Sequence, residues 1–259
     1  MLIMLSADLI FKDTPFIKYK ESGYIGHLPH VNYCLVEYDK NFYDDDLFAR
    51  FGQPFPDVLK NASIKRKAEY LAGRYCGQSL LQKKTTSSIV GTYQRIPQWP
   101  NDWCGSISHT GKYAIVVVVP QSVGLMPGID IENLCPNIMF ESADMFTSFE
   151  EKNILLKSKL PYALALLIVF SAKESLYKSI WNKVKRILDF KAAKIVALDD
   201  AQQSFTLTLT DSLTSALRSG SEYIGRYAFF KDTIITCITT ANEPLKPLYP
   251  GAIESTEVV

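Results

Sequence analysis

The fold is decided near the middle of the chain, in the stretch Tyr113-Ala114-Ile115-Val116-Val117-Val118-Val119. Continuous β-branched and apolar residues without polar alternation are typical of a buried strand. A segment with a proline at each end, residues 120–127, follows and is the best candidate for a junction. Gly128-Ile129-Asp130-Ile131-Glu132 then opens a second half as a short strand end. We therefore predict an N-terminal half, residues 1–124, and a C-terminal half, residues 125–259.

Helical and strand patterns alternate on both sides of this junction. In the N-terminal half we predict a strand over residues 31–38 and a helix that begins at Asn61 or Ser63 and ends near Leu81. In the C-terminal half the patterns predict two helices, followed by four strands whose last two form a hairpin. These helices cover residues 149–156 and 161–184, and the strands cover residues 195–198, 205–209, 224–230 and 233–239. The halves share no sequence repeat, and an α/β (α+β) architecture follows.

Length and composition limit the class of protein. A chain of 259 residues permits two modest domains or one large one, and its 47% apolar residues can build a substantial core. The formal net charge of +1 creates no overall field toward nucleic acid or an anionic membrane. We therefore expect no nucleic-acid partner, and any polyanionic ligand has to be held by a local cluster.

Cysteine and histidine usage argues against a zinc site or a disulfide framework. The five cysteines are widely spaced without a Cys-x-x-Cys pair, and only three histidines occur. The apolar N-terminus lacks a basic region and is interrupted by Asp8, which does not fit a signal peptide. The longest apolar run, residues 162–170, is too short to span a bilayer. We predict a soluble, cytoplasmic protein with reduced thiols and no membrane span.

The first candidate for chemistry is the pair Asp130 and Glu132. Residues two apart on a strand face the same side, so the two carboxylates repel each other unless a cation compensates them. A hard cation such as Mg²⁺ prefers oxygen ligands and suits this pair. Two solvated carboxylates after a turn are the alternative, and the pair taken alone favours that reading.

A second candidate is the pair Glu174 and Lys178, which share one face of a helix at i and i+4. The pair could be an ordinary surface ion pair. Ser171-x-x-Glu174 could also be a capping box, but the apolar pattern continues upstream without a breaker, which places Ser171 inside the helix.

Two basic residues of the first predicted helix, Arg66 and Arg74, form a third candidate. They lie eight positions apart, which is about two helical turns and places them on one face. Guanidinium groups match phosphate oxygens, although a solvated helix face is the usual meaning of such a pattern.

The segment Gly105-Ser106-Ile107-Ser108-His109-Thr110-Gly111 is the fourth candidate. We read it as a polar turn before the buried strand, able to offer backbone N–H groups, hydroxyls and an imidazole to a phosphate. A purely structural histidine is the alternative. Ser108 and His109 do not form a nucleophilic pair, because adjacent residues on an extended chain point apart.

Each of these elements alone is a weak signal, but their order and spacing together point to one family. The series resembles the 4′-phosphopantetheinyl transferase superfamily, in its long enterobactin-synthase and surfactin type. The resemblance runs from about Ser63 to Lys178 and depends most on the last two of the following elements. They are Arg66-Lys67-Ala68-Glu69-Tyr70-Leu71-Ala72-Gly73-Arg74, Trp99-Pro100, Gly105-Ser106-Ile107-Ser108-His109, Gly128-Ile129-Asp130-Ile131-Glu132 and Phe170-Ser171-Ala172-Lys173-Glu174-Ser175-Leu176-Tyr177-Lys178.

The resemblance implies a pseudo-dimer of two similar α/β halves, with coenzyme A and Mg²⁺ in the cleft between them. It implies that Asp130, Glu132 and Glu174 are the metal ligands. Coenzyme A would contact residues from both halves, with Lys178 by the pyrophosphate and Arg95 in a loop that flanks the adenine. The remaining implied coenzyme A contacts are Arg66, Arg74, Ser108, His109 and Asp130.

The implied reaction transfers the 4′-phosphopantetheine arm to a serine of an apo carrier protein and releases adenosine 3′,5′-bisphosphate. Glu174 or a metal-bound water would take the serine proton, and Lys178 would offset charge on the leaving phosphate. An acyl, peptidyl or aryl carrier of siderophore or other nonribosomal peptide synthesis is the expected partner, and the long form is expected to be a monomer. Asp102 departs from the glycine that relatives often carry. A non-catalytic coenzyme A or carrier-binding module and a pyrophosphohydrolase are the competing functions.

Overall fold

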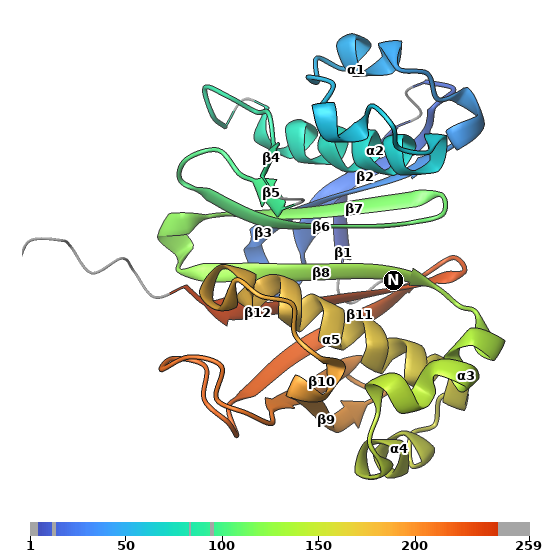
Figure 1. Cartoon of the computed structure of the whole chain (residues 1–259), viewed down its shortest axis with the longest axis vertical. Coiled ribbons are helices and arrows are strands. Elements are labelled where there is room, and N and C mark those ends of the chain that lie inside the picture. The colour runs from blue at the N-terminus through green and yellow to red at the C-terminus, as the bar shows by residue number, and fades with distance from the viewer. Residues whose placement is uncertain (1–4, 12–13, 83, 94–95, 243–259) are drawn as a thin grey trace, which may run out of the picture.

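The computed structural model describes residues 5–11, 14–82, 84–93 and 96–242. Its elements form four layers, in which helix α2 (Ile64–Leu81), two antiparallel sheets and helix α5 (Tyr162–Val184) follow one another (Figure 1). Each long helix covers the outer face of one sheet, and the two sheets face each other in the middle. The predicted mixed α/β class is confirmed.

The N-terminal sheet has the strand order β1-β2-β3-β7-β6. Its centre includes the predicted buried strand, because all of residues 113–119 in β7 are inaccessible to solvent. Helix α2 begins after Ser63, whose side chain caps it by accepting the backbone N–H of Arg66. The strands are β1 (Leu5–Phe11), β2 (Ile17–Ile25), β3 (Leu28–Tyr38), β6 (Trp103–Thr110) and β7 (Tyr113–Pro120). Shorter elements are η1 (Lys40–Phe42), α1 (Asp46–Arg50), η2 (Asp57–Leu59), β4 (Gly91–Tyr93), β5 (Ile96–Gln98) and η3 (Gln121–Val123).

The C-terminal sheet has the strand order β8-β12-β11-β10-β9. The predicted hairpin is confirmed: β11 and β12 pair across a tight turn in which Lys231 has a φ of 52°. The strands are β8 (Leu125–Asn133), β9 (Ala193–Asp199), β10 (Ser204–Leu209), β11 (Glu222–Phe230) and β12 (Thr233–Ala241). The other helical elements are α3 (Pro136–Phe146), α4 (Phe149–Leu156) and η4 (Phe190–Ala192).

Three apolar cores hold the layers together. One lies between α2 and the N-terminal sheet, and another lies between α5 and the C-terminal sheet. The third joins the two sheets, and it contains Ile129 and Ile131 of β8 together with Ile115 and Val117 of β7. Because all four of these side chains are fully buried, β8 is fixed against the N-terminal half.

Some local predictions were wrong. The predicted polar turn at residues 105–111 is largely strand β6, because this segment pairs in register with β7 from Trp103 to Thr110. The junction is shorter than predicted, since β8 already begins at Leu125 after a turn at Gly124.

Both halves combine a five-stranded antiparallel sheet with one long outer helix. The helix follows three strands in the N-terminal half and one strand in the C-terminal half, so the order along the chain differs. The pseudo-dimer and its exact boundaries stay predictions. Within the described part of the chain, none of the helices combines the length and apolar character that crossing a bilayer requires.

Candidate active site

Strand β8 and helix α5 approach each other unusually closely at Gly128. A Cβ atom at this position would lie only 1.8 Å from the carbonyl oxygen of Ser175, so any larger residue would push the helix away. Ile129 and Ile131 point into the core between the sheets, and the alternation of a strand therefore turns Asp130 and Glu132 toward α5. The glycine in the Gly-Ile-Asp-Ile-Glu segment thus brings the acidic side chains next to the helix.

Asp130 accepts three side-chain hydrogen bonds in the site, and it is 2% exposed. Its Oδ1 accepts hydrogen bonds from the Ser108 hydroxyl at 2.7 Å and from the Lys178 ammonium at 2.6 Å. Its Oδ2 accepts the hydroxyl of Ser171 at 2.7 Å. Since Ser108 belongs to β6 and the other two donors to α5, Asp130 joins the N-terminal and C-terminal halves.

A chain of buried hydroxyls supports Asp130 from behind. The Ser171 Oγ lies 2.8 Å from Thr236 Oγ1, which in turn lies 2.7 Å from Ser175 Oγ. All three side chains are inaccessible to solvent. Because Ser175 also donates to the Thr236 carbonyl, the chain fixes the Ser171 hydroxyl that Asp130 accepts.

Glu132 and Glu174 are half-buried and lie in the field of Asp130. Burial raises the pKa of Glu132 to about 8, and the negative charges of Asp130 and Glu174 add to the rise. Burial also raises the pKa of Glu174, reinforced by Asp130 and opposed by Lys178. The site therefore holds three carboxyl groups for one contacting lysine, and without a further cation the two glutamates resist ionisation.

The donor set fits a hard divalent cation in its chemistry, because carboxylate oxygens are the ligands Mg²⁺ prefers and the surplus of carboxyl groups favours a cation. The geometry is less complete. Among the described residues, no three acidic, histidine or cysteine side chains converge as a metal site requires. Asp130, Glu132 and Glu174 would therefore have to turn toward one another to share one ion.

Arg66 and His109 lie together on the N-terminal side of the site. Arg66 Nη1 and His109 Nε2 are 3.0 Å apart, and a guanidinium can only donate, so Nε2 is the unprotonated nitrogen. Burial, together with the nearby positive charges of Arg66 and Lys178, lowers the pKa of His109 to about 4. The ring is neutral at pH 7, so its 3.6 Å contact with the Glu69 carboxylate is not an ion pair there.

Arg74 and Arg66 have different partners in the structure. The Arg74 side chain is buried, and its Nη2 donates to the Gly91 carbonyl at 3.2 Å and to the Thr92 hydroxyl at 2.6 Å. Its guanidinium also lies over the Tyr70 ring. Arg74 therefore holds β4 against α2 in this structure. Arg95 lies outside the described residues.

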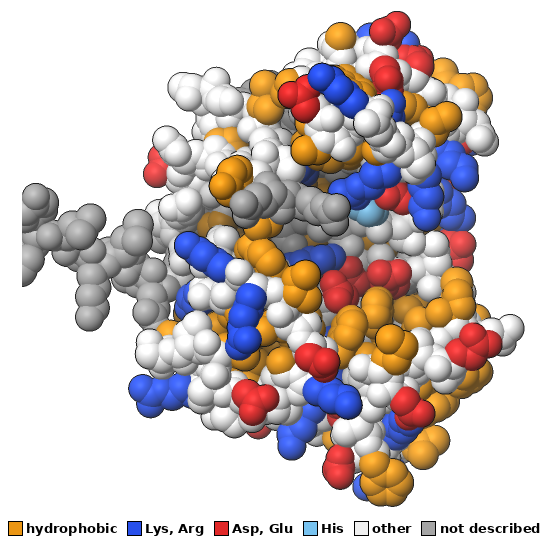
Figure 2. Space-filling view, in the orientation of Figure 1, with side chains coloured by type: hydrophobic (Ala, Val, Ile, Leu, Met, Phe, Trp, Pro, Cys, Tyr) orange, Lys and Arg blue, Asp and Glu red, His pale blue; other side chains and the backbone are white. Residues whose placement is uncertain are grey.

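Figure 2 shows a hollow between the two halves, in which acidic side chains gather on the C-terminal side below basic side chains and a histidine. His109 lies in the field of Lys178 and Asp130, and Asp130 acts on Glu132 and Glu174, so these groups share one region with Arg66. Opposed acidic and basic walls suit a ligand that carries phosphates at one end and binds with a cation at the other.

Sequence reasoning missed Ser171 and Thr236 as supports of Asp130. A signal for Ser171 was present, because Ser171, Ser175 and Lys178 recur at i, i+4 and i+7 as a polar stripe in an apolar helix. Thr236 gave no such signal. It reaches the site only because β12 pairs with β8, where Thr236 is opposite Asp130.

Comparisons with known proteins identify the family of the chain. Residues 55–119 match a family model described as the 4′-phosphopantetheinyl transferase N-terminal domain, and residues 126–237 match the 4′-phosphopantetheinyl transferase superfamily. Enterobactin synthase component D of Salmonella austin is 35% identical over 199 residues, which cover 76% of this chain and 80% of that protein. The protein of the same name from Escherichia coli K12 is 35% identical over 60% of this chain and 72% of its own length.

A more distant relative, named 4′-phosphopantetheinyl transferase PptT, comes from Mycobacterium tuberculosis. It is 27% identical over 156 residues, covering 57% of this chain and 67% of that protein. The two family models match separate parts of the chain, one containing Arg66 and His109 and the other Asp130 and Glu174. With the long alignment to enterobactin synthase component D, these matches show that the chain belongs to the 4′-phosphopantetheinyl transferase superfamily.

Proposed function

We propose that this chain transfers the 4′-phosphopantetheine arm of coenzyme A to a serine of an apo carrier protein and releases adenosine 3′,5′-bisphosphate. One observation carries the proposal: His109, which contacts Arg66, also lies in the field of Lys178 and Asp130, so a basic and an acidic group share one region. Coenzyme A has both a pyrophosphate and a 3′-phosphate, so it needs cationic groups at two separate places. The family and the names of its relatives support the same reaction.

We propose that Mg²⁺ is bound by Asp130, Glu132 and Glu174. The surplus of carboxyl groups and the raised pKa values of the two glutamates support this ligand set. A bound Mg²⁺ would neutralise charge on the pyrophosphate oxygens. Ser108 and Ser171 orient the Asp130 carboxylate by donating to its two oxygens.

Coenzyme A is proposed to lie across both halves. Arg66 is half-exposed and can turn its guanidinium to a phosphate, and neutral His109 can donate from Nδ1. Lys178 is 28% exposed beside Asp130, where its ammonium can reach the pyrophosphate and offset charge on the leaving phosphate. Ser108 holds both Asp130 and Lys178, so it links the metal ligands to the nucleotide side.

Arg74 and Arg95 complete the proposed coenzyme A contacts. The guanidinium of Arg74 is engaged with Gly91 and Thr92, so its effect on coenzyme A includes the position of β4. Arg95 follows that strand and is proposed from the family resemblance alone.

Glu174 is the residue we propose to take the proton of the attacking serine. Its raised pKa makes it a better base than an exposed carboxylate, and a half-buried position leaves it within reach of a second protein. The attack forms a bond between the serine oxygen and the β-phosphorus, and the bond to the bridging oxygen of the pyrophosphate breaks. The leaving phosphate keeps that electron pair.

We propose that the chain works as a cytoplasmic monomer composed of the halves 1–124 and 125–259. Ser108 of the first half and Asp130 of the second meet within one chain, so the site is complete without a partner copy. All five cysteines are free thiols, as a reducing compartment permits. Peptidyl and aryl carriers of siderophore synthesis are the preferred partners, because relatives are named as enterobactin synthase components.

Mass spectrometry of apo carrier proteins tests the proposal. Peptidyl, aryl and acyl carriers are each incubated with the chain, coenzyme A and Mg²⁺, and parallel samples contain a chelator instead of Mg²⁺. We expect the mass of the arm on the carrier serine, and none after its replacement by alanine. Modification of no carrier would favour a non-catalytic binding module, and free phosphopantetheine without a carrier would identify a pyrophosphohydrolase.

A further inference from the structure

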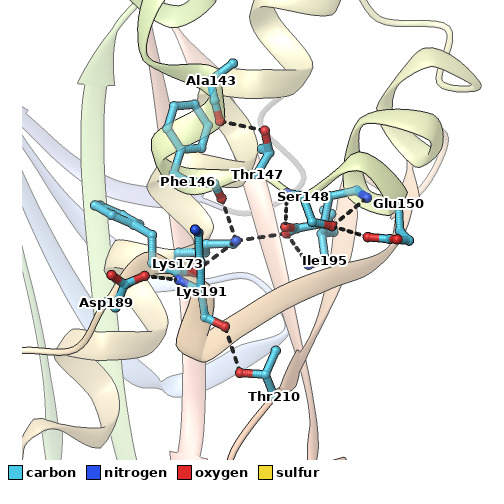
Figure 3. Close-up of polar contacts among 12 residues, drawn as sticks. Ala143, Phe146, Thr147, Ser148, Glu150, Lys173, Asp189, Lys191, Ile195 and Thr210 are labelled. Carbon is cyan, nitrogen blue, oxygen red and sulfur yellow. Dashed lines mark hydrogen bonds and ion pairs between the residues drawn. The ribbon is translucent and has the colours of Figure 1, made fainter.

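A second lysine–carboxylate pair lies inside the C-terminal half, away from the solvent. Lys173 Nζ is 2.8 Å from Glu151 Oε1, and the two side chains are 1% and 4% exposed. Lys173 directly precedes Glu174 on α5, but it points to the interior, toward the connection between α3 and α4 (Figure 3). The proposed transfer mechanism does not use this pair.

Every hydrogen-bonding group of the pair has a partner. The Lys173 ammonium donates to Glu151, to the Phe146 carbonyl at 2.6 Å and to the Phe190 carbonyl at 3.1 Å, which uses its three protons. Glu151 Oε1 also accepts the backbone N–H of Ile195 at 2.8 Å. Its Oε2 accepts the N–H of Ser148 at 2.8 Å, as part of the capping box of α4. One charge pair therefore joins α5 to the end of α3, the start of α4, η4 and β9.

Such a pair is poorly explained by stability alone. Removing two charges from water is costly, and well-packed apolar residues of similar volume often stabilise a protein equally well. A polar group that binds several segments at once does fix their relative positions, because each bond has a defined direction. The Lys173–Glu151 pair therefore fixes the relative positions of the segments that it joins.

The segments that it fixes connect two of the proposed metal ligands. Glu132 stands near the end of β8, α3 begins shortly afterwards, and Phe146 at the end of α3 accepts from Lys173. Lys173 is bonded in sequence to Glu174. We propose that Lys173 is a positioning residue, which holds the rotation of α5 and the path of α3 so that Glu174 stays in register with Glu132.

This proposal rests on the proposed function, because it assigns the pair a role in Mg²⁺ binding by the same site. Its effect should appear in the affinity for the cation rather than in the affinity for coenzyme A. The proposed coenzyme A contacts on the N-terminal side, Arg66 and His109, have no bond to the pair. Loss of the pair should leave them in place.

Three full-length variants test the role. Lys173→Met/Glu151→Gln removes both charges, so that neither is left buried without a partner. Lys173→Arg keeps the charge. Lys183→Met is the matched control, because Lys183 lies on the same helix but donates to the Ala241 carbonyl at 2.8 Å, at the end of β12. Circular dichroism checks folding, and Glu151→Gln alone replaces the double variant if the latter does not fold.

Two measurements separate the possible outcomes. We expect the Mg²⁺ concentration for half-maximal transfer to rise ~10-fold in the double variant, the scale of losing a residue that supports a metal ligand. The KM for coenzyme A should not change, and Lys173→Arg should recover most of the loss. Calorimetric titration of Mg²⁺ into protein and coenzyme A, without any carrier, should show the same weakening.

A folded double variant that binds and uses Mg²⁺ as the wild type and Lys183→Met do overturns the positioning role. A wild-type protein that binds Mg²⁺ with coenzyme A but modifies no carrier overturns the proposed function instead. In that second case the calorimetric titration of the variants still decides whether Lys173 positions the ligands.

Discussion

Two lysines of helix α5 each pair with a carboxylate from another element, but the two pairs differ in their surroundings. Lys178 lies 2.6 Å from Asp130, and Lys173 lies 2.8 Å from Glu151. In the first, open pair the lysine side chain is 28% exposed, whereas both side chains of the second, sealed pair are almost inaccessible. The two pairs therefore occupy opposite sides of one helix, one facing the hollow and one facing the interior.

The surroundings explain what each pair can do. The sealed pair has one positive and one negative charge. Its other hydrogen bonds go to backbone groups, which are held in place by the helices and strands around them. In the open pair, Lys178 faces Asp130, and the half-buried carboxyl groups of Glu132 and Glu174 lie nearby with raised pKa values. A balanced pair fixes structure, and an unbalanced one next to solvent can exchange partners with a cation or a phosphate.

Breaking the sealed pair should have the largest effect on stability. Lys173→Met leaves Glu151 charged and buried, and takes the donor from two carbonyls. We expect the free energy of unfolding to fall by about 3–5 kcal/mol, the usual cost of removing one partner of a buried ion pair. Urea denaturation measures the loss.

Lys178→Met is the matched variant on the open side. Asp130 is itself buried, but it would keep the hydroxyls of Ser108 and Ser171 as donors to both of its oxygens. Its loss of stability should be clearly smaller than that of Lys173→Met. Equal losses in the two variants would show that the open pair is as structural as the sealed one.

Removing the carboxylate of the open pair should have the largest effect on activity. We expect Asp130→Ala to fold and to lose at least ~10²-fold in transfer rate, because one electrostatic stabiliser of the reacting phosphates is removed. The control is Asp232→Ala, at the exposed β11–β12 turn, where the carboxylate pairs with Lys112. Carrier modification measured by mass spectrometry gives both rates, and near-wild-type transfer by Asp130→Ala would defeat the metal assignment.

Periodicity predicted the elements with a strong apolar pattern, and these include the supports of the site. Helices α2, α4 and α5 and the β11–β12 hairpin lie close to their predicted bounds. Helix α3 was not predicted, because Pro136 opens it and many of its apolar side chains, such as Ile138 and Phe140, remain exposed. Its buried face is narrow, with Met139, Ala143 and Phe146, and the exposed apolar residues between them obscure the helical periodicity.

The candidate residues were found from motifs, but their partners come from the folded structure. Asp130 was predicted beside a cation, yet Ser171 and Thr236 reach it only through the packing of α5 and β12 on β8. The two lysines of α5 show the limit most clearly. The sequence places both near Glu174 and contains no sign that Lys173 turns inward, which depends on where Glu151 and the α3–α4 connection lie.

The raised pKa of Glu132, beside the open pair, should make the stability of the protein depend on pH. Between the ordinary pKa of a glutamate and about 8, folded Glu132 stays protonated while the unfolded chain ionises. The unfolded state is therefore favoured increasingly, and metal-free protein should lose stability as the pH rises from about 4.5 to 8. Glu132→Gln should remove this loss and be the more stable protein above pH 8, by on the order of 2 kcal/mol after allowance for solvent screening.

Thermal unfolding of both proteins in the presence of a chelator measures the difference. The two should be similarly stable well below pH 4.5, where Glu132 is protonated in the folded and the unfolded state. Glu150→Gln serves as the control, since that carboxylate is exposed and accepts from Ser148, and its pKa is lowered instead of raised. A stability difference that does not grow with pH would contradict the raised pKa of Glu132 beside the open pair.

The smallest effect should come from His109, which lies across the hollow and senses the positive charge of the open pair. Its pKa of about 4 means that the unfolded chain takes up a proton between pH 6.5 and 4 while the folded ring does not, so stability falls on acidification through that window. His109→Asn should remove a dependence on the order of 1 kcal/mol after screening of the partly exposed ring. In NMR titrations, Lys178→Met should raise the pKa of His109, while Lys173→Arg leaves it unchanged. If the pKa of His109 is the same in Lys178→Met and in the wild type, the lysine does not face the histidine across a shared site.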